Sequence, residues 1–505
     1  MWLSGLLILG GAPAFANYKQ AREAFAKKDY TKAAAAYYQA FESSDNTAEK
    51  RKAEWGLAQS LQKLGLYYSA SKYYSLIVRR GRTEDNPFFR SALEELGNIN
   101  GKLSLGRSHI VQLFKADIRP SDIPGPARGF YFYYKGVEAF GSRSLENAEK
   151  YFSRVPSGSP YALGAMFHEG VIAVLKGRHG QSVTLFEKVL AETRDKSDYR
   201  ELHEMALMNL ARVNYEIKRF PEAISYYGQI PRDSDNWLDA IWEASWAFFF
   251  MEKFNNTLGN IHTIHSPFFE NRFYPEAYIL QAITFLRMCR YDQVKESMRR
   301  FKERYQPVFG DVKGMLNRFN GDPKGFFRFV YDYRSGSLSS YRRAEEIVKK
   351  LSLVDSYKEA TDTIRFADRE LESLRNFDEL KSSGLTESLN SFLESKKSAA
   401  VLDAGQRMYT EGKGYYQELL ELSNQTKLIV AEMQLGKLDR LRDLIKVVGD
   451  DDKKLQFIGG MQKLNINQTL EYWPFEGEYW EDELGFYVYN MPSKCIAKDD
   501  KEKDK

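Results

Sequence analysis

The chain has 505 residues, of which 43% are hydrophobic and 28% charged, so it can bury a large core beneath a charged surface. Its formal net charge of +4 is small for this length, and no concentrated basic stripe is present, so we expect no nucleic-acid partner. Runs that alternate polar and apolar residues are nearly absent, which leaves little room for a β-sheet. These properties predict a large all-helical protein.

Residues 1–16 have the pattern of an export signal. Residues 2–9 are almost wholly apolar, glycines and a proline interrupt the run over residues 10–13, and Ala14-Phe15-Ala16 is the small-x-small pattern that signal peptidase accepts. The run lacks the preceding Lys or Arg of an ordinary signal. A membrane anchor is the alternative, but so short a run cannot cross roughly 30 Å of hydrocarbon. We expect cleavage after Ala16, no transmembrane segment in the mature chain, and a periplasmic location.

Residues 17–307 repeat one helical hairpin. Each copy has a small residue in its first helix, a short turn, a small residue in its second helix and a large, usually aromatic, residue four positions later. The first small position is occupied by Ala21, Ala58, Gly136, Gly170, Ala211, Ser245 and Ala282. The second small position and the large residue are Ala33 and Tyr37, Ala70 and Tyr74, Ala148 and Phe152, Ser182 and Phe186, Ala223 and Tyr227, Thr257 and Ile261, and Val294 and Met298. Two of the steps are 34 residues, from Gly136 to Gly170 and from Ala211 to Ser245.

This pattern and period resemble the tetratricopeptide repeat (TPR), a helical scaffold for binding other proteins. The resemblance implies a superhelical solenoid of about seven to eight hairpins over residues 17–307. An eighth hairpin has room between residues 88 and 114, although that segment lacks the small and aromatic residues. Residues 117–129 contain three prolines and are predicted to form a loop.

Beyond Pro307 the pattern changes. Residues 340–374, 378–397 and 399–448 carry amphipathic helical periodicity with interspersed charges, so we expect long helices over residues 308–460. They form either an antiparallel helical hairpin or a coiled coil, and the periodicity does not choose between intramolecular packing and a homo-oligomer. Residues 461–497 are rich in aromatics broken by Pro and Gly, which predicts an irregular tail packed onto a groove of its own chain or of a neighbour. Residues 498–505 form a mixed-charge tail that we expect to be disordered.

The chain contains two cysteines, which form a natural pair in an oxidising compartment. Cys289 lies in the predicted turn of the last recognisable hairpin and Cys495 lies near the C-terminus. A bridge would close a loop of about 200 residues, for which chain entropy gives roughly 5 kcal/mol. The alternative is two free thiols.

Two stretches extend the resemblance beyond the generic repeat. The first comprises residues 242–247, 258–262, 266–269 and 289–292, and the second is the aromatic segment 472–485. Both are similar to exported tetratricopeptide proteins of bacterial envelopes, some of which are linked to gliding-type motility machinery. The resemblance implies that the partners are other cell-envelope proteins.

Tetratricopeptide geometry places the first helix of each hairpin on the concave groove, with defined positions around the first small residue pointing into it. These positions are mostly aromatic, which suits an amphipathic helix or an extended apolar segment of a partner. The alternative is that the protein's own C-terminal helices or tail fill the groove. The candidate peptide-groove residues are Trp55, Gln59, Tyr133, Phe140, Phe167, Arg212, Tyr215, Trp242, Trp246 and Phe249.

An enzymatic function has little support in the sequence. His262 and His265 are a close pair but lack a partner at metal-ligand spacing, so we interpret them as a polar helix face. We therefore expect a non-catalytic periplasmic scaffold for protein–protein interaction, with no metal and no cofactor. The alternatives are an adaptor for cell-wall or outer-membrane assembly and, from a different class, a cell-wall enzyme with an unrecognised C-terminal domain.

Overall fold

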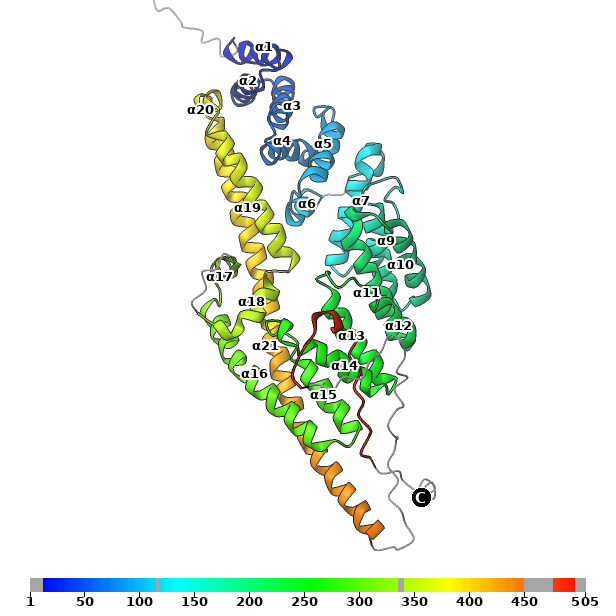
Figure 1. Ribbon diagram of the computed structural model, residues 1–505. Helices are drawn as coiled ribbons and strands as arrows, with labels where there is room; N and C mark the ends of the chain where they lie inside the picture. Colours follow the sequence, from blue (N-terminus) through cyan, green and yellow to red (C-terminus); the bar gives the residue numbers. More distant parts are fainter. Residues whose placement is uncertain (1–11, 115–117, 335–339, 449–475, 496–505) are drawn as a thin grey trace, which may run out of the picture. The chain divides into compact units, whose positions relative to one another are not determined.

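The computed structural model describes residues 12–114, 118–334, 340–448 and 476–495, and all regular structure in these ranges is helical (Figure 1). The chain divides into two compact units. Unit 1 comprises residues 1–172, 322–328 and 353–408, and unit 2 comprises residues 173–321, 329–352 and 409–505. The chain passes from one unit to the other five times, and three of these passages lie within helices, namely α9, α17 and α21. In the described ranges, every helix is either too short or too polar to cross a membrane.

Unit 1 contains the first hairpins together with a later pair of long helices. Its hairpin helices are α1 (Ala12–Ala26) with α2 (Tyr30–Ser43), α3 (Thr47–Lys63) with α4 (Tyr67–Arg79), and α7 (Arg128–Gly141) with α8 (Leu145–Phe152), followed by the start of α9 (Ala162–Leu175). The helices α5 (Phe89–Lys102) and α6 (Arg107–Leu113) lie between the second and third of these pairs in the sequence. Its remaining elements are the 3-10 turns η1 (Pro120–Asp122) and η2 (Gly125–Ala127), the start of α17 (Pro323–Arg334), α19 (Asp355–Leu374), α20 (Asp378–Ser382) and the first part of α21 (Leu385–Val448).

Unit 2 contains the later hairpins and the C-terminal tail. Its hairpin helices are α10 (His179–Thr193), α11 (Arg200–Glu216) with α12 (Phe220–Tyr227), α13 (Trp237–Phe250) with α14 (Phe254–Ile264), and α15 (Glu276–Arg287) with α16 (Tyr291–Arg318). Its other elements are α18 (Glu345–Leu351), the second part of α21, and the 3-10 turns η3 (Ser197–Tyr199), η4 (Pro267–Phe269), η5 (Arg342–Ala344) and η6 (Glu481–Glu483).

Seven hairpins share one turn geometry. In each, the residue two positions before the second helix has a left-handed backbone, with φ between 54° and 80°. The next N–H donates to the carbonyl five residues earlier, as in Leu66 N to Leu61 O at 3.0 Å and Arg219 N to Asn214 O at 2.7 Å. This 6→1 bond closes the first helix in a Schellman-type cap and directs the chain into the second helix. The left-handed residues are Lys28, Gly65, Arg143, Gly177, Lys218, Glu252 and Cys289.

The predicted small positions are buried in all seven copies, and so are the large residues that follow them. Gly136 shows why the size matters, because a Cβ there would lie 2.6 Å from the ring of Phe152 in the second helix of the same hairpin. Small side chains therefore allow the two helices to approach, and the large residue fills the space beside them. The repeat assignment is confirmed.

The segment without the consensus residues forms two helices, α5 and α6, which do not pack closely on each other as the helices of the other hairpins do. It packs through Leu93, Leu96, Ile110 and Phe114, all of which are buried. Gly106, with φ of 82°, directly precedes α6, so this turn differs from the other seven. The predicted loop at 117–129 contains η1 and η2 and ends where α7 begins at Arg128.

Two predicted boundaries in the long-helix region need correction. The helix α16 continues through Pro307 to Arg318, so the predicted boundary at 307 lies inside the second helix of the last hairpin. The predicted helix over 340–374 is two helices, because Val354 is extended between α18 and α19. The helix α21 is a single helix of 64 residues without a break near residue 398.

The long helices pack within the chain as antiparallel pairs, which was one of the two alternatives. In unit 1, α19 and the first part of α21 are joined by an ion pair of 2.7 Å between Asp368 and Lys397. In unit 2, the later part of α21 runs antiparallel to α16, where the rings of Phe309 and Tyr416 stack at 4.6 Å and Tyr409 donates to Leu316 O at 3.1 Å.

Candidate binding surfaces

Five candidate groove residues lie in unit 1, on α3, α7 and α9, and all five are half-buried. Trp55 stacks on Phe88 at 5.2 Å with an interplanar angle of 4°, and its ring centroid is 5.5 Å from that of Tyr74. Phe88 comes from the connection between α4 and α5, so it covers one face of the indole. Gln59 lies one helical turn after Trp55 on α3.

The other three unit 1 residues surround a histidine. The ring centroid of His168 is 5.8 Å from those of Tyr133 and Phe140 and 6.0 Å from that of Phe167. Phe152 stacks on the same imidazole at 4.9 Å. Burial lowers the pKa of His168, so the imidazole is neutral near pH 7 and packs as an aromatic ring. The unit 1 candidates thus form two clusters, one at Trp55 and one at His168.

In unit 2 the candidate residues form a row of rings across α11 and α13. Trp242 and Trp246 are 6.1 Å apart, Trp246 is 6.1 Å from Phe250, and Phe250 is 6.0 Å from Tyr215. Phe249 joins the row at 5.8 Å from Trp246. We call these five side chains the ring row. Phe250 is 53% exposed. It was not among the predicted groove residues because it lies one residue after the groove position Phe249.

Arg212 is the exposed member of the predicted groove, but its charge is already paired. Its guanidinium donates to Glu243 at 2.6 Å and 2.9 Å, and Tyr227 donates to the same carboxylate at 2.8 Å. Glu243 lies on α13, so this bidentate pair joins the first helices of two successive hairpins. Arg212 therefore positions α11 against α13 rather than presenting a free cation to a ligand.

The described part of the tail, residues 476–495, binds along α14, where Figure 1 shows it as the red segment. Tyr489 N donates to Asn255 O at 3.0 Å, and Gly485 N donates to Thr263 Oγ1 at 2.9 Å. The tail backbone also crosses Gly259, where a Cβ would lie 1.7 Å from Tyr487 O. The repeats of unit 2 thus hold an extended peptide through backbone hydrogen bonds and a close approach that only glycine allows.

The prediction that His262 and His265 form a polar helix face was wrong. The imidazole of His262 stacks on Tyr479 at 4.6 Å and meets Tyr487 edge-on at 4.8 Å, and His265 stacks on Tyr278 at 4.0 Å. Burial lowers the pKa of His262 to about 4 and that of His265 to about 3. Both rings are neutral near pH 7, and tail residues cover the first of them. Tail tyrosines distant in sequence cover His262, so local periodicity could not reveal the burial of that ring.

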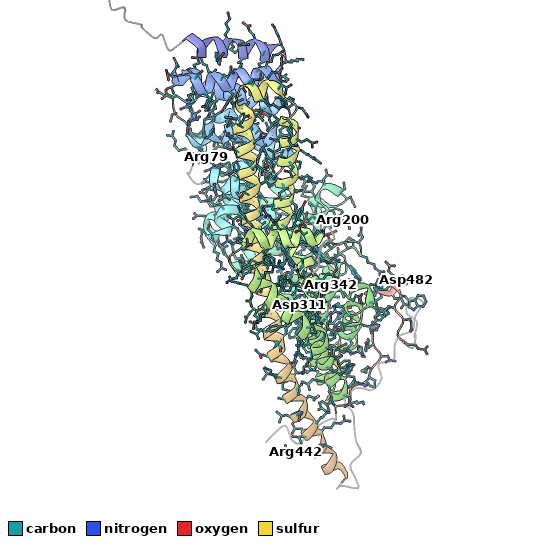
Figure 2. The ribbon with its side chains drawn as sticks, turned by 90° about the vertical axis from the view of Figure 1, so that its left-hand side faces the viewer. Arg79, Arg200, Asp311, Arg342, Arg442 and Asp482 are labelled. Carbon is teal, nitrogen blue, oxygen red and sulfur yellow. A yellow bond between two sulfur atoms is a disulfide. The ribbon has the colours of Figure 1, made fainter. Side chains whose placement is uncertain are left out.

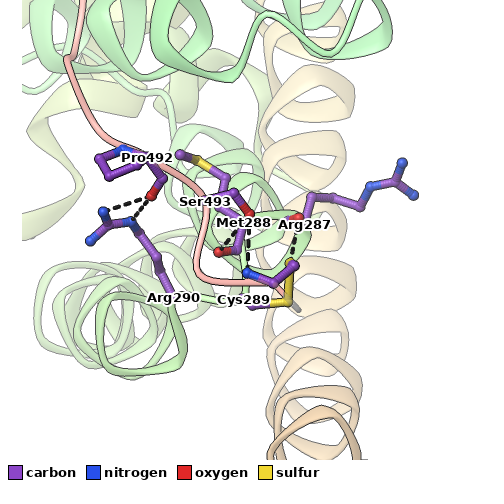
Figure 3. Close-up of a disulfide and its surroundings, with 7 residues drawn as sticks. Arg287, Met288, Cys289, Arg290, Pro492 and Ser493 are labelled. Atoms are coloured by element: carbon purple, nitrogen blue, oxygen red, sulfur yellow. Dashed lines mark hydrogen bonds between the residues drawn. A yellow bond between two sulfur atoms is a disulfide. The ribbon is translucent and has the colours of Figure 1, made fainter. Parts of the chain in front are cut away.

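A disulfide between Cys289 and Cys495 fastens the end of the tail (Figure 3). The two cysteines are 206 residues apart in sequence, and Cys289 is the left-handed residue of the α15–α16 turn. Beside the bond, Arg290 donates to Pro492 O at 2.9 Å and 2.7 Å, and Lys494 N donates to Met288 O at 2.9 Å. The tail is therefore held at Pro492 and Lys494 by Arg290 and Met288, the two residues that flank Cys289.

Glu370 is a key residue that sequence reasoning missed. Its carboxylate, on α19, accepts from Tyr68 N at 2.6 Å, Ser69 N at 2.9 Å and Ser69 Oγ at 2.7 Å. These N–H groups lie in the first turn of α4. The N-cap residue of α4, Leu66, makes no side-chain hydrogen bond that would cap the helix. A carboxylate at a helix N-terminus satisfies free donors and complements the helix dipole. Glu370 thereby fixes the long-helix pair onto the second hairpin of unit 1.

The regular left-handed turns and the buried small residues decide the type of hairpin. These hairpins have the geometry of tetratricopeptide repeats. No protein-family model matches the sequence, and the search of curated proteins found no significant match.

Solved structures similar to this chain include tetratricopeptide proteins. One from Parabacteroides merdae is 12% identical over 58% of this chain and 93% of its own, with a TM-score of 0.25. A thermophilic one from Thermus thermophilus is 18% identical over 47% of this chain and 99% of its own, with a TM-score of 0.18. The apo form of RapI is 10% identical over 76% of this chain and 97% of its own, with a TM-score of 0.33. Scores this low do not transfer function, so the tetratricopeptide assignment depends on the repeats themselves.

Proposed function

We propose that this protein is a non-catalytic scaffold that binds protein partners through its tetratricopeptide repeats. The observation that carries the proposal is the tail on α14. Residues 476–495 are a peptide segment without α-helix that is extended after residue 486, and the repeats hold it by hydrogen bonds to backbone and side chain and by aromatic contacts with His262. A surface that binds one extended segment of its own chain has the chemistry to bind segments of others.

The ring row of unit 2 is the surface we assign to partners. Half-exposed aromatic rings held rigidly on helices contribute large apolar area at low entropic cost, which is the usual property of residues that dominate binding energy. Contacts within the row and with Phe220, which stacks on Phe250 at 5.8 Å, restrict these side chains before a partner arrives. An apolar or amphipathic segment of a partner would cover them.

The proposed location is the bacterial periplasm, within an envelope complex that includes motility-related machinery. The apolar N-terminal run with its small-x-small sequence supports export, and the pairing of both cysteines suits an oxidising compartment. Cell fractionation together with the N-terminal mass of the purified protein tests this location. A periplasmic chain that begins at Asn17 is the expected result, and a cytoplasmic chain that retains residues 1–16 would contradict it.

The binding role is tested by replacing two rings of the row, Trp242→Ala with Trp246→Ala, and recovering partners after cross-linking in intact cells. We expect the partners to be lost because the substitutions remove both indole rings of the row. Phe268→Ala is the matched control, since Phe268 is an exposed aromatic residue of unit 2 outside the row. An unchanged set of partners in the double variant would contradict the proposal.

A further inference from the structure

We propose that the outer face of the tail is a second docking surface, which binds a basic protein segment. This face consists of Trp480, Phe486 and Val488, bordered by the acidic turn of residues 481–483, and we call it the tail ridge. The inference rests on the proposed role as a protein-binding scaffold, but it names a different surface from the ring row and a defined chemistry for the partner.

The tail ridge arises because more buried and more exposed side chains alternate over residues 484–489. Leu484 is buried, with 3% of its surface exposed, and Tyr487 and Tyr489 contact His262 on α14. The residues between and before them point outward, so Phe486 is 67% exposed and Val488 39% exposed. Trp480 is 54% exposed at the start of the same turn. Three large apolar side chains therefore face solvent from a segment of nine residues.

This segment is held rigidly although its outer side chains are exposed. Glu483 N donates to Trp480 O at 3.2 Å and Phe486 N donates to Glu483 O at 2.9 Å, which closes two successive turns. Arg232 donates to the backbone carbonyls of Glu481 and Asp482, and its guanidinium lies 5.9 Å from the ring centroid of Phe486. Exposed rings on a fixed backbone lose little entropy when a partner binds, which favours affinity.

The charge of the tail ridge determines the kind of partner. Glu481, Asp482 and Glu483 are consecutive and exposed, and Figure 2 shows the turn that carries Asp482 on the outside of the repeat helices. Arg232 contributes one positive charge, but it contacts backbone carbonyls there. Three carboxylates beside an apolar surface complement Lys or Arg that flank aromatic or aliphatic side chains, and such charges steer association. The geometry thus fits a basic, partly apolar protein segment.

The test uses the purified, oxidised full chain and a library of random twelve-residue peptides displayed on phage. Peptides that contain Lys or Arg beside aromatic or aliphatic residues are the expected selection. One such peptide, labelled with a fluorophore, is then titrated against variants. Trp480→Ala with Phe486→Ala should weaken binding on the order of tenfold or more, because it removes both central rings. Phe268→Ala, a similarly exposed ring of unit 2 that belongs to neither the ridge nor the ring row, should leave the affinity unchanged.

The acidic contribution is tested separately with Glu481→Gln, Asp482→Asn and Glu483→Gln in one chain. These exposed substitutions keep side-chain size, so the expected result is weaker binding and a loss of its dependence on salt concentration. The inference would be overturned if the library selected acidic peptides. It would also be overturned if the labelled peptide bound the Trp480→Ala, Phe486→Ala variant as tightly as it binds the parent chain. Trp242→Ala with Trp246→Ala should not affect this peptide, so the ring row and the tail ridge can fail independently.

Discussion

At the scale of single residues, Gly259 determines how closely the tail can approach α14. Alanine is normally favoured over glycine inside a helix by about 1 kcal/mol. Here the added Cβ would lie 1.7 Å from Tyr487 O and 2.4 Å from Tyr487 C, both of which are backbone atoms. We therefore predict that Gly259→Ala lifts the tail and increases hydrogen exchange of residues 485–491, with a loss of stability of about 1–3 kcal/mol.

Gly414→Ala is the control for that substitution. Gly414 is also helical, on α21, and a Cβ there would meet no atom within 4 Å. The same change should leave the exchange of the tail unaltered and should stabilise the helix slightly. Equal protection of the tail in both variants would show that Gly259 does not limit the approach.

His262 makes the stability of unit 2 depend on pH. In the unfolded chain its pKa is near 6.5, and burial lowers the folded value to about 4. Between these values the unfolded chain binds a proton that the folded chain does not, so stability falls as pH decreases from about 6.5 to about 4. His262→Phe keeps a ring against Tyr479 without a titratable group. Urea unfolding at pH 7 and pH 5 should therefore show a smaller loss in this variant. His265 titrates in the same direction and leaves a residual slope.

At the scale of elements, the attachment of α19 to α4 depends on Glu370. We predict that Glu370→Ala destabilises unit 1 by about 1–3 kcal/mol, because it leaves buried N–H groups at the start of α4 without an acceptor. Glu370→Gln retains one acceptor oxygen and should lose less. Glu372→Ala, an exposed position on the same helix, is the control. Urea unfolding would contradict this role of Glu370 if both alanine variants lost the same small amount.

The elements also show what sequence reasoning can and cannot reach. The small and aromatic positions were predictable because they are set by local spacing within each hairpin. The helices α5 and α6 were visible only as a gap of suitable length between hairpins, since they pack through ordinary residues such as Leu93 and Phe114. Glu370 contacts residues some 300 positions away, and the burial of His262 comes from the tail, so neither leaves a local signal. The pairing of Cys289 with Cys495 could be suggested only because the sequence contains two cysteines, since no spacing motif indicates it.

At the scale of the whole molecule, neither unit is a continuous stretch of sequence. Five leucines from the long-helix region belong to the same buried cluster as the first hairpins, and they are Leu374, Leu380, Leu385, Leu389 and Leu393. A fragment of residues 17–307 would expose the core that they cover. We predict that this fragment binds a hydrophobic dye and unfolds without a cooperative transition, unlike the full chain. A monomeric fragment with a sharp transition would contradict this prediction.

The bond between Cys289 and Cys495 has a consequence for how the molecule is completed. Ribosomes make the first cysteine 206 residues before the second, so the bridge can form only when almost the entire polypeptide exists. Any product truncated before Cys495 carries an unpaired thiol in the α15–α16 turn. That thiol is a chemical mark of an unfinished chain, which thiol–disulfide exchange enzymes could distinguish from a finished one.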